Sequence, residues 1–125
     1  MAPIPVHIVT GPPGAAKSAF IARLCAQRPD WLGLVSSSAA ASGPNLKALA
    51  PGCPCCTGRV VLQISLARAL RDTRAVRALV ELPDAGHLAA LEHALSEAPL
   101  GLSVLSSRQI TLPRDSGLQA EDLEP

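Results

Sequence analysis

Residues 11–18 read GPPGAAKS and directly follow a short apolar run, an arrangement typical of a phosphate-binding loop between a strand and a helix. In such a loop, successive backbone N–H groups and the positive end of the following helix face the phosphate oxygens. Lys17 would reach the β- and γ-phosphates of a nucleotide, and Ser18 would place its hydroxyl on Mg²⁺. The residues expected to hold the phosphates and this ion are Gly11, Gly14, Ala15, Ala16, Lys17 and Ser18.

One position departs from the usual pattern G-x-x-x-x-G-K-[ST], because Ala16 stands where that pattern has its second glycine. The added methyl group would crowd the ligand or strain the backbone by roughly 1–3 kcal/mol, which weakens binding without necessarily abolishing it. An alternative interpretation is a Pro/Gly turn between strand and helix, in which Lys17 is only an exposed base.

A second group of reactive side chains lies in GCPCC at residues 52–56. Its cysteines are Cys53, Cys55 and Cys56. They are too close in sequence for unstrained disulfides with one another. Three thiolates from one loop suit a borderline or soft ion such as Zn²⁺, with a fourth position open or filled from elsewhere. His87 and His93 are candidate fourth ligands, although a histidine near a helix surface is more often solvated.

Two other interpretations of the cysteine cluster stay open. The thiols would form a redox-sensitive group, or the loop would bind nothing. The remaining cysteine, Cys25, falls on the apolar face of an expected helix and is most simply a core residue.

The elements that must position these groups follow from hydrophobic periodicity. Strands are expected at residues 5–10, 31–35, 76–82 and 100–105, and helices at residues 17–28, 59–71 and 87–97. This alternation predicts an α/β fold with a short parallel sheet of about four strands and helices on its faces. Residues 1–110 would form the single domain. Residues 111–125, with two prolines, four acids and one base, are expected to be a flexible acidic tail.

Composition limits the classes of partner. The chain has 125 residues, a net charge of +1, one Trp, one Phe and no Tyr, so neither a basic surface nor stacking side chains support binding to nucleic acid or to an anionic membrane. The N-terminus lacks the features of a signal peptide, and no apolar run approaches the ~18–20 residues that span a bilayer. We therefore expect a cytoplasmic protein, in which clustered cysteines are more often ligands or reactive thiols than disulfides.

The order of these motifs resembles that of the CobW-like metal-chaperone GTPases, a family of P-loop proteins. In that family a Walker A loop, here residues 11–18, is followed by G-C-x-C-C ahead of a helix, here residues 52–56. Residues 80–87, VELPDAGH, are similar to the family segment in which a strand delivers a glutamate near Mg²⁺ and the γ-phosphate. The resemblance covers most of residues 5–105.

This resemblance implies a P-loop NTPase-like three-layer fold that binds GTP with Mg²⁺, holds Zn²⁺ at the cysteines and delivers metal to client proteins. It makes Glu81 the metal-side carboxylate and gives Lys17 and Glu81 the catalytic roles. Asp84 replaces the glycine whose N–H contacts the γ-phosphate, so hydrolysis is expected to be weak or absent. The chain's single asparagine, Asn45, precedes a leucine, which excludes the Asn-Lys-x-Asp element that reads guanine.

Two further functions remain as alternatives to a nucleotide- and metal-binding protein. One is a non-enzymatic accessory module that retains the fold and binds a partner, and the other is a thiol-based redox sensor. A small open sheet also leaves an edge and a helix face to be covered, which predicts a homo-oligomer or a client or partner protein.

Overall fold

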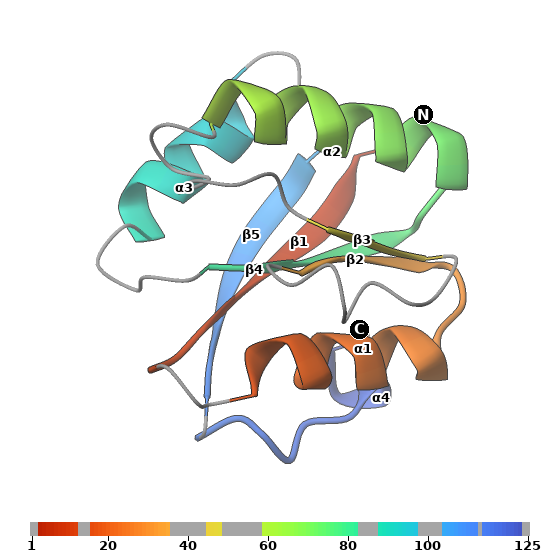
Figure 1. Ribbon diagram of the computed structural model, residues 1–125, viewed down its shortest axis with the longest axis vertical. Helices are drawn as coiled ribbons and strands as arrows, with labels where there is room; N and C mark the ends of the chain where they lie inside the picture. Colours follow the sequence, from red (N-terminus) through yellow and green to blue (C-terminus); the bar gives the residue numbers. More distant parts are fainter. Residues whose placement is uncertain are drawn as a thin grey trace.

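The computed structural model describes residues 3–12, 16–35, 45–48, 59–82, 88–97, 104–112 and 114–123 (Figure 1). Apart from two consecutive strands, its elements alternate between strands and helices, as the sequence predicts. In chain order they are β1 (Ile4–Thr10), α1 (Lys17–Gln27), β2 (Trp31–Val35), β3 (Leu46–Ala48), α2 (Arg59–Thr73), β4 (Arg77–Glu81), α3 (Leu88–Ser96), β5 (Val104–Thr111) and α4 (Ala120–Leu123).

The strands form one parallel sheet in the order β3-β2-β4-β1-β5. This confirms the α/β class, but the described sheet has five strands rather than about four. The additional strand is β3, a three-residue segment at the edge of the sheet that pairs with β2 through Gly33 and Leu46. Three residues are too few to show a periodic pattern, and they follow the Ser- and Ala-rich residues 36–44, which lie outside the described ranges.

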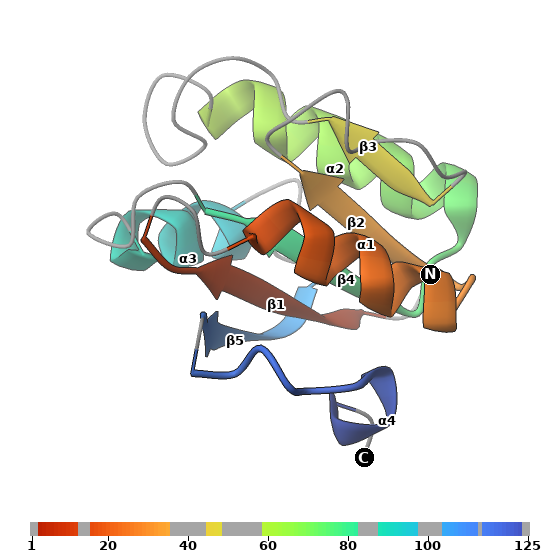
Figure 2. The same cartoon turned by 60° about the horizontal axis from the view of Figure 1, so that its bottom comes forward.

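Helices cover both faces of the sheet. Helices α1 and α4 lie on one face, and α2 and α3 lie on the other (Figures 1 and 2). The connection from β1 through α1 to β2 and the connection from β4 through α3 to β5 run in opposite directions along the sheet. Because parallel crossovers are right-handed, opposite directions place the two helices on opposite faces.

Each face of the sheet has its own apolar core, so the inner strands are buried on both sides. Under α2 and α3, the strand residues Ile8, Leu32 and Val80 pack with Leu66 and Leu91. Residues of the opposite alternation face α1 and α4. They include Val9, Leu79 and Ile110, which pack with Ile21 and Leu24. Because both alternating sets of side chains are buried, runs such as residues 31–35 contain almost no polar side chains.

Residues 114–123 differ from the flexible tail that the composition suggested. Arg23 on α1 donates hydrogen bonds to the carbonyls of Ser116 and Leu118 at 3.0 and 2.7 Å. Ala120 and Leu123 on α4 are buried in the core that α1 covers. The apolar residues of this segment are few and scattered, so their burial depends on contacts with α1 that no local pattern reveals.

Strand β5 also differs from its expected bounds, because it runs over Val104–Thr111 rather than over residues 100–105. Its second half contains Arg108 and Gln109, which are exposed, and only Ile110 is buried on that stretch. A polar edge strand of this kind lacks the continuous apolar run used to predict it. Residues 100–103 lie outside the described ranges.

Asn45 closes the junction between α1, β2 and β3. Its side-chain amide donates to the carbonyls of Cys25 and Trp31, both at 2.9 Å, and to that of Arg28 at 3.4 Å. Its own carbonyl accepts the N–H of Gly33 at 2.8 Å. The asparagine therefore satisfies carbonyl groups at the end of α1 that the helix itself leaves unpaired.

Gly33 is required where β2 packs against α1. A Cβ atom at this position would lie 2.7 Å from Ile21 Cγ2, 2.7 Å from Leu46 Cδ2 and 2.9 Å from Cys25 Sγ. The Gly33→Ala variant is expected to lose ~1–3 kcal/mol of unfolding free energy, because these buried side chains must shift. Urea unfolding would measure the loss.

The matched control is Gly117→Ala, since nothing lies within 4 Å of the Cβ atom that this change adds. It should stay within about 0.5 kcal/mol of the wild type. Equal stability of the two variants would contradict the close packing described for Gly33.

Candidate functional site

The candidate site lies at the edge of the sheet where β1 and β4 end. These strands are neighbours, with Val9 in register with Glu81, and the N–H of Leu82 donates to the Val9 carbonyl at 2.9 Å. The helices that follow the two strands cover opposite faces of the sheet. In a parallel sheet, such a point leaves a crevice outside the carboxyl ends of the strands, where ligands bind.

Lys17, the first residue of α1, reaches back over the loop that precedes it. Its Nζ donates to the carbonyls of Gly11 at 3.1 Å and Pro12 at 3.3 Å. The side chain is largely buried, with 9% of its surface exposed. Lys17 is therefore not the freely exposed base of the alternative interpretation, because the loop backbone holds its ammonium group at the sheet edge.

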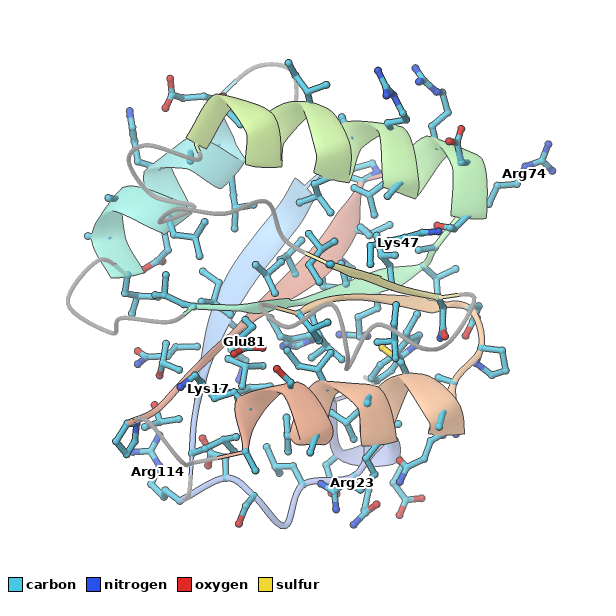
Figure 3. All side chains as sticks on the ribbon, in the orientation of Figure 1. Lys17, Arg23, Lys47, Arg74, Glu81 and Arg114 are labelled. Carbon is cyan, nitrogen blue, oxygen red and sulfur yellow. The ribbon has the colours of Figure 1, made fainter. Side chains whose placement is uncertain are left out.

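Ser18 and Glu81 join the start of α1 to the end of β4. The Ser18 hydroxyl donates a hydrogen bond to Oε1 of Glu81, whose side chain is buried. Figure 3 shows Lys17 and Glu81 close to the first turn of α1, beneath the sheet. The fold thus brings together three of the residues selected from the sequence, although 63 positions separate Ser18 from Glu81.

This pair has the chemistry of a Mg²⁺ site. A hydroxyl and a carboxylate are both hard oxygen ligands, and Mg²⁺ is usually held by one or two such protein groups together with phosphate oxygens and water. The hydrogen bond already places the two oxygen atoms in contact. An ion bound by both groups would link the two oxygen atoms in place of this hydrogen bond.

Ala16 caps α1 in a left-handed conformation, with φ 59° and ψ 42°, and its side chain makes no capping hydrogen bond. Glycine adopts this conformation without steric cost, whereas an L-residue with a Cβ loses roughly 1–2 kcal/mol. The position therefore has a backbone conformation that favours glycine. Gly11 also has a positive φ, 155°, where the chain leaves β1.

Several predicted site residues lie outside the described ranges: Gly14, Ala15, Cys53, Cys55, Cys56, Asp84 and His87. Their predicted roles remain predictions. Within the described ranges, no three His, Cys, Asp or Glu side chains gather as a metal site. His93 is exposed on α3, and its Nε2 lies 3.5 Å from Oε1 of Glu97.

Cys25 is buried between α1 and β2, and burial raises the pKa of its thiol to about 12. A thiol with this pKa stays protonated at neutral pH, so it is neither a good metal ligand nor a good nucleophile. The structure agrees with its assignment as a core residue, and any thiolate chemistry must come from the other cysteines.

Sequence reasoning missed a turn beside the candidate site. Thr111 of β5 pairs in register with Thr10 of β1, and the N–H of Leu112 donates to the Thr10 carbonyl at 2.9 Å. The chain therefore leaves β5 at the same edge where the loop after β1 begins. Arg114 and Asp115, in the segment expected to be a tail, lie in this turn.

No protein-family model, curated protein or solved structure matches the chain. In the described part of the chain, no helix combines the length and the apolar character needed to cross a bilayer.

Proposed function

We propose that this chain is a P-loop nucleotide-binding protein of the CobW-like type, which binds a nucleoside triphosphate with Mg²⁺ and handles Zn²⁺ or a related ion through its cysteine loop. The observation that carries the proposal is the contact between the Ser18 hydroxyl and the Glu81 carboxylate beside the Lys17 ammonium. These groups supply two ligands for Mg²⁺ and one cation for phosphate at the same sheet edge.

Phosphate binding would use the positive charge that the fold concentrates at the start of α1. The helix begins at Lys17 with no acidic residue in its own first turn, and the carboxylate that approaches this end is that of Glu81, through Ser18. A phosphate group would take the Lys17 ammonium from the carbonyls of Gly11 and Pro12, because a charged acceptor binds an ammonium more strongly than a neutral carbonyl does.

Hydrolysis is proposed to be weak or absent. In phosphoryl transfer the protein acts mainly by positioning and charge neutralisation, which here would depend on Lys17 and on Glu81 through Mg²⁺. The strained backbone at Ala16 weakens the loop that must surround the phosphates. Because the sequence lacks the element that reads guanine, GTP and ATP are both candidate ligands.

The metal half of the proposal is linked to the nucleotide half by topology. Residues 49–58, which include Cys53, Cys55 and Cys56, connect the carboxyl end of β3 to the start of α2. Since β3 is parallel to β2, and β2 to β4, Ala48 at the end of β3 lies at the edge of the sheet where Glu81 lies. The cysteines follow Ala48 within eight positions, which supports a metal site near this edge.

Thermal unfolding tests the nucleotide half. Millimolar GTP or ATP with Mg²⁺ should raise the melting temperature, because a ligand at 100 times its dissociation constant adds ~2.7 kcal/mol to stability. Adding Mg²⁺ alone is the control for nonspecific ion effects. An unchanged melting temperature with both nucleotides would contradict the proposal.

Zinc titration against a chromogenic chelator tests the metal half. The wild type and Cys25→Ala should bind one Zn²⁺, and the variant with serine at positions 53, 55 and 56 should not. Cys25→Ala is the matched control because that thiol is buried and protonated. Equal zinc binding by the wild type and the triple variant would exclude the thiolate site and favour the redox or accessory alternative.

A further inference from the structure

The turn that follows β5 is closed by hydrogen bonds at the edge of the sheet where the candidate phosphate site lies. Asp115 donates its N–H to the Thr111 carbonyl at 2.8 Å, and Oδ2 of Asp115 accepts the N–H of Thr111 at 2.8 Å. These reciprocal bonds close the turn around Arg114. Because Thr111 is in register with Thr10, the turn projects from the same edge as the loop that leads to Lys17.

Arg114 is an exposed cation at this edge. Its side chain is 75% exposed, and its Nη2 makes a contact of 3.4 Å with Oδ2 of Asp115. In Figure 3, Lys17 and Arg114 lie on the same side of the molecule, near the ends of β1 and β5, whereas Arg74 lies at the opposite end. Arg23 lies farther along α1 and is engaged with the carbonyls of Ser116 and Leu118.

The carboxylate of Asp115 contacts two donors, the Thr111 N–H and the Arg114 guanidinium. The hydrogen bond from the Thr111 N–H is the largest cause that holds the pKa of this carboxylate below its usual range, and the Arg114 guanidinium also lowers it. The bond to the Thr111 N–H is the shorter of the two and fixes the turn. The longer contact leaves the guanidinium able to move to a stronger acceptor.

We propose that Arg114 is a second phosphate-binding side chain, which contacts the phosphate chain anchored by Lys17 and which Asp115 restrains when no phosphate is bound. This inference rests on the proposed function. A guanidinium presents a planar fork that binds phosphate oxygens in a bidentate manner, which a single 3.4 Å contact with a carboxylate does not match. The ligand class is a triphosphate, whose several negative charges need more than one cation.

Equilibrium binding of Mg²⁺-tripolyphosphate and of Mg²⁺-GTP at fixed ionic strength tests this assignment. Arg114→Gln should weaken both ligands about fivefold to tenfold, and Arg114→Lys should weaken them less because the charge remains. Asp115→Asn keeps an oxygen acceptor for the Thr111 N–H and removes the competing charge, so it should tighten binding about twofold.

The matched control is Arg71→Gln, which removes an exposed arginine near the end of α2, at the opposite edge of the sheet. It should bind within about twofold of the wild type, and the exposed-arginine variants at positions 71 and 114 should keep the wild-type melting temperature. If Arg114→Gln binds like Arg71→Gln while Lys17→Met binds poorly, the role of Arg114 is overturned and the proposed function stands. If the wild type binds neither ligand, the role of Arg114 and the proposed function are both contradicted.

Discussion

Replacing Lys17 with methionine is expected to weaken the binding of Mg²⁺-triphosphate at least about 100-fold, which corresponds to ~2.8 kcal/mol. Methionine keeps an unbranched apolar stem in a position that is largely buried, but it removes the ammonium group that contacts the carbonyls of Gly11 and Pro12. Only the backbone N–H groups of the loop would then remain to bind the phosphate oxygens. Isothermal titration with GTP and with ATP measures the change.

The chain offers a matched control in its other lysine, Lys47, which is exposed on β3. Figure 3 places Lys47 on the far side of the sheet from the first turn of α1. Lys47→Met should bind triphosphate with nearly the wild-type affinity. Similar affinities for the two lysine variants would show that Lys17 is a structural residue of the turn and not a phosphate ligand.

The second large effect concerns His7, a buried histidine near the middle of β1. Its Nε2 lies 2.8 Å from Nη1 of Arg77, and since arginine only donates, Nε2 must accept and the ring must be neutral. Within the described residues, its buried Nδ1 has no hydrogen-bond partner. Burial, followed by the charges of Arg77 and Arg108, lowers the pKa of His7 to about 4 from the usual 6.5.

This lowered pKa makes stability depend on pH. Between pH 6.5 and about 4 the unfolded chain binds a proton at His7 that the folded chain does not. The stabilising contribution is therefore complete above pH 6.5 and is lost as the pH falls to about 4. A shift of this size corresponds to ~3 kcal/mol of unfolding free energy.

Urea unfolding at a series of pH values from 7 to 4 would measure the dependence. His7→Gln keeps an oxygen acceptor for Arg77 but cannot titrate, so this variant should lose ~3 kcal/mol less than the wild type over the range. His93→Gln changes an exposed histidine on α3 and should preserve the wild-type slope. Parallel curves for the wild type and His7→Gln would contradict the assignment of a neutral His7.

The sequence predicts those elements whose pattern is local. β2 has the bounds Trp31–Val35 that its apolar run suggests, and α1 begins at Lys17 and stops before Pro29. The sequence does not reveal β3, because this three-residue strand is defined mainly by its pairing with β2. The packing of Leu123 against α1 was missed for the same reason, since it depends on a docking surface formed by residues about 100 positions away.

The candidate site could be predicted only in part. The loop motif identifies Lys17 and Ser18 without reference to the fold, whereas Glu81 was selected through a family resemblance. Its contact with Ser18 depends on β4 lying next to β1, a strand order that hydrophobic periodicity does not determine. Arg114 carries no motif, and its position follows from the register of β5 with β1.

The Mg²⁺ dependence of triphosphate binding tests the central claim most directly. GTP or ATP binding would be measured by isothermal titration for the wild type and for Ser18→Ala, each with Mg²⁺ and with a chelator. The Ser18–Glu81 pair predicts that Mg²⁺ strengthens binding to the wild type at least about tenfold and strengthens binding to Ser18→Ala much less. Ser96→Ala, at an exposed serine on α3, should respond to Mg²⁺ like the wild type. Equal affinity of the wild type with and without Mg²⁺, or no binding at all, would contradict the account.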